Sequence, residues 1–121
     1  MTTLDPDEIR DHLLAAAAER ETLTYSQILG LLGFRFTRPL MRHLCAVLDR
    51  IDEDARAAGE PELAVLVVRQ SDGLPGQGWF VLHSARDGDE SDWPTQWEGP
   101  EARRFVARYQ NAAFDYWART V

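Results

Sequence analysis

The chain has 121 residues, a formal net charge of −7, 45% hydrophobic residues and one cysteine, Cys45. This length predicts a single domain over residues 1–121, and one cysteine excludes an internal disulfide and the usual thiolate zinc sites. No apolar run approaches the roughly 20 residues of a membrane span, and the acidic N-terminus does not suit an export signal, so we expect a cytoplasmic protein without metal or cofactor.

The first predicted element is a helix that begins after Asp5 and ends near Glu21. Asp5 is a suitable N-cap, Pro6 suits the first helical position, and apolar residues follow at helical spacing from Ile9 onward. Residues 22–24 are expected to form a short extended stretch that leads into the next helix.

Residues 23–48 predict two helices joined by a tight corner, which is the outline of a helix-turn-helix. Thr24 and Gln27 have the spacing of a capping box at the start of the first helix, and Gly33 suits the left-handed residue that ends it. The helical spacing assigns Leu31 to the apolar face of this helix.

The second helix of the pair is predicted to begin near Thr37 and to end at Gly59, a natural C-terminal cap. Apolar residues from Leu40 to Ala55 form one stripe at helical spacing. The acidic residues among them are assigned to the outer face and are Asp49, Asp52, Glu53 and Asp54. A solvated face is preferred to a docking site for a basic partner, because charge runs usually keep a protein soluble.

A β-hairpin is predicted from two apolar runs, residues 63–68 and 79–82, which are separated by the turn-forming residues 70–78. A hairpin beside a helix-turn-helix has the shape of a wing. A phosphate cradle at the turn glycines is disfavoured, because no predicted helix begins directly after them. We therefore expect an α+β, winged-helix-like domain with its core at residues 5–83 and with added N- and C-terminal helices.

The acidic, polar segment at residues 84–92 is expected to be a surface loop. Trp93 and Trp97 follow in a turn-rich stretch and are interpreted either as a cover packed on the core or as an exposed contact surface. The last predicted element is a helix at about residues 101–118. Its apolar face is assigned to Phe105, Tyr109, Ala112, Ala113 and Tyr116.

Charges are segregated along the chain. Residues 22–48 carry no acidic residue and three arginines, Arg35, Arg38 and Arg42, whereas the segments that follow are strongly acidic. A DNA-binding domain needs local positive charge, because the neutralisation of phosphates supplies much of its affinity. The three arginines are therefore candidate phosphate contacts, and Gln77 in the wing or Arg35 could reach into a groove.

Three motifs carry a family resemblance. Thr24 and Tyr25 open the helix pair, residues 59–68 follow the pattern G-x-P-x-L-x-x-L-V-V, and residues 75–80 follow P-G-x-G-(F/W). Together these motifs resemble a group of small, mostly uncharacterised bacterial proteins with a winged-helix-like fold. Some proteins of that type carry nuclease domains, so the resemblance implies work near DNA, although this chain has no such domain.

A more distant likeness is to the winged-helix domain of alkylguanine-DNA alkyltransferases and alkyltransferase-like proteins. That likeness implies a phosphate contact for Tyr25 beside a flipped base, and it places Arg38 about one residue from the position that fills the gap in the base stack. The reactive Pro-Cys-His-Arg motif of the enzymes is absent, because residues 63–69 read Leu-Ala-Val-Leu-Val-Val-Arg. Alkyl transfer is therefore excluded.

We expect no enzymatic activity, because Cys45 and His43 lie two positions apart on one helix and do not face each other. DNA binding through Tyr25, the three arginines and Gln77 is preferred narrowly. The alternative is a protein-interaction module of the same fold without nucleic-acid binding. Its candidate aromatic anchors are Phe34, Phe36, Trp93 and Trp97. A small-molecule or enzymatic role in a cleft between the wing and the last helix ranks last.

Overall fold

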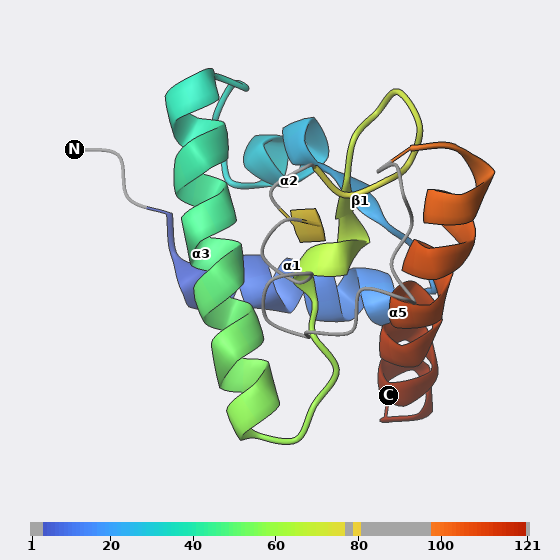
Figure 1. Cartoon of the computed structure of the whole chain (residues 1–121). Helices are drawn as coiled ribbons and strands as arrows, with labels where there is room; N and C mark the ends of the chain where they lie inside the picture. Colours follow the sequence, from blue (N-terminus) through green and yellow to red (C-terminus); the bar gives the residue numbers. More distant parts are fainter. Residues whose placement is uncertain (1–3, 77–78, 81–97, 121) are drawn as a thin grey trace.

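The computed structural model describes residues 4–76, 79–80 and 98–120 (Figure 1). Over these residues the chain is a helix-rich α+β fold with a small parallel sheet, in agreement with the α+β part of the predicted fold class. The elements in chain order are α1 (Pro6–Ala18), β1 (Leu23–Thr24), α2 (Tyr25–Leu31), α3 (Arg38–Ala57), the 3-10 helix η1 (Ala64–Leu66), β2 (Val67–Val68) and α5 (Gly99–Thr120).

Side-chain caps define where the first three helices begin. Asp5 caps α1 by accepting a hydrogen bond of 3.0 Å from a backbone N–H two residues later. Thr24 and Gln27 form both hydrogen bonds of the capping box that begins α2, and the Thr37 hydroxyl caps α3. These caps confirm the predicted helix starts. The starts could be predicted from the sequence because each cap joins residues only a few positions apart.

The sheet differs from the predicted hairpin. β2 pairs with β1 in parallel, with Leu23 opposite Val67 and Thr24 opposite Val68. The first apolar run is a strand only at its end, since residues 64–66 form η1. Trp79 and Phe80 are helical, and the Trp79 N–H donates a hydrogen bond of 3.0 Å to the Gly76 carbonyl. The predicted second strand is therefore wrong at residues 79–80, and residues 81–82 lie outside the described residues.

Asp52 explains why the chain turns before β2. Its side chain is 2% exposed, and its Oδ1 accepts hydrogen bonds of 2.8 Å and 3.0 Å from the backbone N–H groups of Leu63 and Ala64. These two N–H groups have no acceptor within η1. The Asp52 side chain, which lies on α3, therefore caps the start of η1. The assignment of Asp52 to the solvated outer face of α3 is wrong.

The described helices and β2 share one hydrophobic core. Helix α1 lies across both α3 and α5 (Figure 1), and α5 contributes Phe105, Val106 and Phe114 to the core. Ala112 and Tyr116, which the spacing assigns to the buried face of α5, are exposed. No helix among the described residues is both long and apolar enough to cross a bilayer. The predicted loop at residues 84–92 lies outside the described part of the chain.

Removal of the Asp52 carboxylate should destabilise the fold strongly. The Asp52→Ala variant leaves two buried N–H groups without their acceptor, and we expect the free energy of unfolding to fall by about 2–4 kcal/mol. Urea denaturation measures this decrease. Asp54→Ala is the matched control, since Asp54 is an exposed acid on the same helix, and its change should stay within about 0.5 kcal/mol. Equal effects of the two substitutions would contradict the capping role.

Candidate functional site

The corner between α2 and α3 is a tight turn built around Gly33. This glycine has a φ of +88°, a left-handed conformation that suits glycine, and it allows the Phe34 N–H to donate a hydrogen bond of 2.9 Å to the Leu29 carbonyl. The chain then extends to Thr37, which caps α3. Residues 34–38 therefore lie at the N-terminal end of α3, which begins at Arg38 (Figure 1).

Three arginines lie on this corner, and we call residues 34–42 the arginine corner. Arg38 is the first residue of α3 and Arg42 follows one turn later, so the two share a helix face. Arg35 precedes them in the connecting segment, and all three side chains are exposed. Within the described residues none of the three guanidinium groups forms an ion pair or a hydrogen bond.

The two halves of α3 differ in charge. Its first turn contains no acidic residue, whereas its C-terminal half exposes Asp49, Glu53 and Asp54. A polyanion lying along the whole helix would meet these carboxylates. The N-terminal end of α3, together with the corner, is therefore the part that suits an anionic partner.

The predicted aromatic anchors separate in the structure. Phe34 is half-buried against the core, while Phe36 is 47% exposed on the arginine corner. Leu31 is 52% exposed at the end of α2, so its assignment to the buried face is wrong. The remaining predicted anchors and the wing residue lie outside the described residues, and they are Trp93, Trp97 and Gln77.

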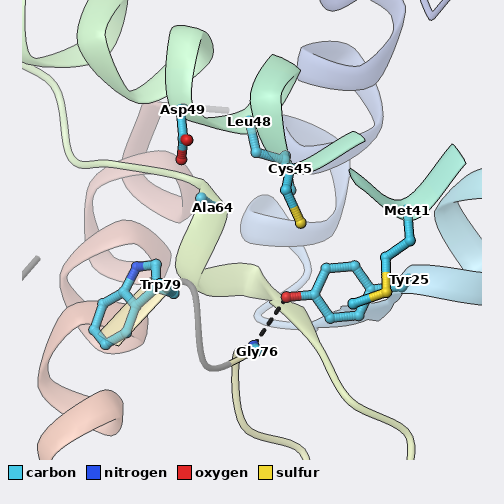
Figure 2. A pocket seen from close by; sticks show the side chains of 8 residues that line it. All are labelled: Tyr25, Met41, Cys45, Leu48, Asp49, Ala64, Gly76 and Trp79. Atoms are coloured by element: carbon cyan, nitrogen blue, oxygen red, sulfur yellow. Dashed lines mark hydrogen bonds between the residues drawn. The ribbon is translucent and has the colours of Figure 1, made fainter. Parts of the chain in front are cut away.

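Tyr25 lies in the core, where its side chain supports the fold. It is 8% exposed, and its hydroxyl oxygen accepts a hydrogen bond of 2.9 Å from the Gly76 N–H (Figure 2). A Cβ at Gly76 would lie only 3.0 Å from that oxygen, so the close approach favours glycine. Burial raises the pKa of Tyr25, against a smaller opposing effect of the Gly76 hydrogen bond. The position of Tyr25 does not support a direct phosphate contact.

A pocket of about 300 Å³ lies beside Tyr25, and its described walls come from α3, η1, Gly76 and Trp79. Its described lining residues are those labelled in Figure 2: Tyr25, Met41, Cys45, Leu48, Asp49, Ala64, Gly76 and Trp79. Sequence reasoning missed this pocket, because its described lining comes from four separate parts of the chain. We call it the Tyr25 pocket.

A second pocket, also about 300 Å³, shares Tyr25 and Met41 with the first one and reaches the arginine corner. Phe36 lines it together with polar side chains that include Ser26, Gln70 and Ser71. The exposed ring of Phe36 therefore borders a concave surface.

The thiol of Cys45 is not prepared for nucleophilic attack. Burial raises its pKa, and the nearby Asp49 carboxylate raises it further. A reactive cysteine needs the opposite shift, because the thiolate is the nucleophile. The described residues also contain no group of three or more His, Cys, Asp or Glu that could hold a metal ion.

Comparisons of the chain with protein-family models, with curated proteins and with solved structures found no match. The function therefore has to be inferred from the arginine corner and the pockets themselves. Of the residues predicted to bind nucleic acid, the structure brings Arg35, Arg38 and Arg42 together on one exposed corner and places Tyr25 in the core.

The burial of Tyr25 predicts a decrease in stability at high pH. The phenol titrates near pH 10 in the unfolded chain and at a higher pH in the folded protein, so its contribution to stability is complete below pH 10 and is lost as the pH rises through the folded pKa. We expect the free energy of unfolding to fall more steeply above pH 10 for the wild type than for Tyr25→Phe, as measured by urea denaturation. Tyr116→Phe, which removes an exposed phenol, should keep the wild-type dependence.

Proposed function

We propose that the chain is a non-enzymatic, winged-helix-like module that binds DNA through the arginine corner. The observation that carries the proposal is the exposure of Arg35, Arg38 and Arg42 without an ion pair to any described residue. Arginine is well suited to this role, because its planar guanidinium stays charged and can donate two parallel hydrogen bonds to a phosphate.

The order of the elements supports the winged-helix part of the proposal. Helix, strand, helix and helix, followed by β2, is the order of a winged helix as far as the first strand of its wing. The parallel pairing of β2 with β1 holds this strand beside the start of α2.

The charge distribution supports one orientation on DNA. The acidic C-terminal half of α3 and the net charge of −7 oppose a broad contact with phosphates. An end-on approach by the N-terminus of α3 brings Arg38 and Arg42 to the backbone and keeps the acidic half away from it. Such contacts position the protein without reading sequence.

The free thiol of Cys45 is in keeping with a reducing compartment such as the cytoplasm.

A protein-interaction module is the second candidate, and one observation favours it. Leu31 and Phe36, which are 52% and 47% exposed, place apolar side chains at the same corner as the arginines. Exposed aromatic and arginine side chains are typical anchors of protein interfaces. An acidic partner surface would fit this combination.

A salt series on double-stranded oligonucleotides tests the DNA proposal. We expect wild-type affinity to fall steeply as salt rises, because bound counterions are released from each neutralised phosphate. The Arg35→Ala/Arg38→Ala/Arg42→Ala variant should bind more weakly, and the slope of log K against log salt should become shallower by about 0.9 for each phosphate that is no longer neutralised.

The matched control removes three exposed arginines elsewhere, Arg50, Arg104 and Arg108. This control variant has the same net charge as the variant of the arginine corner. If the corner is the contact surface, the control should keep most of the wild-type affinity, because its corner is intact. Equal weakening by both triple variants would indicate a nonspecific charge effect. Absence of wild-type binding at low salt would contradict DNA binding and leave the surface formed by Leu31 and Phe36 as the better-supported one.

A further inference from the structure

Helix α3 has one long face that stays exposed. Its buried stripe, from Leu44 to Ala55, packs on the core, and Figure 1 shows the helix at one side of the fold. Along the opposite face, exposed residues recur at intervals of four or three positions, which is the spacing of one helix face. We call these residues the outer stripe of α3, and they are Arg38, Arg42, Ala46, Asp49 and Glu53.

The charges of the outer stripe oppose the helix dipole. Arg38 and Arg42 lie in the first two turns, near the end that carries the positive partial charge, whereas Asp49 and Glu53 lie in the half that leads to the negative end. The two arginines are four residues apart, as are the two acids, so like charges are neighbours on the helix surface in both halves. A partner that brings the opposite charge to each half would relieve both conflicts.

The two ends of the outer stripe present charges to the outside. Within the described part of the chain, neither Arg38 nor Glu53 forms an ion pair. Arg56 lies three positions after Glu53, but its guanidinium is 3.2 Å from the Glu62 carboxylate and is paired there. Arg38 and Glu53 are therefore the charges that an external partner would meet.

A second copy of α3, running in the opposite direction, is complementary to the outer stripe. With a two-fold axis beside Ala46, Arg38 of each copy faces Glu53 of the other, and Arg42 faces Asp49. The antiparallel direction also places each helix end beside the oppositely charged end of its neighbour. Ala46 is small, so the two helices can approach closely where they cross. A uniformly anionic partner would match only the first half of the stripe.

We propose that two copies of the chain associate through their α3 helices, antiparallel, with reciprocal Arg38–Glu53 ion pairs across a two-fold axis at Ala46. The association is weak and reversible, because exposed ion pairs contribute little and two molecules with a net charge of −7 repel each other. The inference does not rest on DNA binding. Its consequence for DNA binding is that the dimer covers Arg38 and Arg42, so self-association competes with the proposed DNA contact.

Charge reversal tests the pairing. In a dimer of Arg38→Glu, or in a dimer of Glu53→Arg, both contacts bring like charges together, so each substitution should weaken self-association by about tenfold or more. An equimolar mixture of the two variants restores opposite charges at both contacts and should associate as the wild type does. Translational diffusion, measured by NMR from micromolar to millimolar protein, follows the association.

Net charge and folding are controlled in the same experiment. Glu53→Arg raises the net charge by two, from −7 to −5, so general repulsion decreases while the specific pair is lost. Both reversals agree with the helix dipole and should leave α3 folded, which near-ultraviolet circular dichroism checks. The matched controls are Arg104→Glu on α5 and Asp54→Arg, whose side chain lies about 100° around α3 from Glu53. Both controls should associate like the wild type.

Cross-linking tests the orientation. In a Cys45→Ser background, Ala46→Cys places one thiol of each copy beside the axis, and a short bismaleimide should join them. Ala57→Cys places its two thiols at opposite ends of the interface and should give little covalent dimer. Diffusion that is independent of concentration up to millimolar protein would overturn the proposal. So would a mixture of the two reversed variants that fails to associate, or equal cross-linking through positions 46 and 57.

Discussion

The buried carboxylate of Asp52 ties α3 to the segment that crosses the core. By accepting the N–H groups of Leu63 and Ala64 it turns the chain into η1, and η1 leads directly into β2. β2 pairs with β1, and β1 ends at the N-cap of α2. Through η1 and the sheet, the Asp52 side chain therefore helps to position α2, together with the shared hydrophobic core. The two backbone hydrogen bonds that Oδ1 accepts help to offset the cost of burying this polar side chain.

The helix starts could be predicted because their causes are local. Thr24 and Gln27 are three residues apart, and Thr37 caps an N–H three residues later. The sheet could not be predicted in the same way, because an apolar run does not identify its partner strand. The placement of Asp52 failed for another reason. Its position, four residues after Leu48, lies on the apolar stripe, but its charge was taken as evidence for solvent exposure.

The candidate functional residues also differ in how far the sequence alone could place them. Exposed arginines in a segment without acids are visible in the sequence, and the structure leaves Arg35, Arg38 and Arg42 exposed. The burial of Tyr25 is not visible, since its hydrogen-bond partner Gly76 lies 51 residues away. A motif that opens a helix pair can therefore place an aromatic ring in the core as readily as on the surface. Tyr25 and Gly76 also line the Tyr25 pocket.

The parallel pairing of two short strands has a consequence for how the molecule assembles. β1 and β2 are the two ends of the chain segment that contains α2, α3 and η1, so their pairing closes a loop around that segment. With two residues in each strand, the ladder itself offers few hydrogen bonds to offset the entropy of closing so long a loop. The packing of α3 and η1 against the core therefore has to supply most of the free energy that closes this loop.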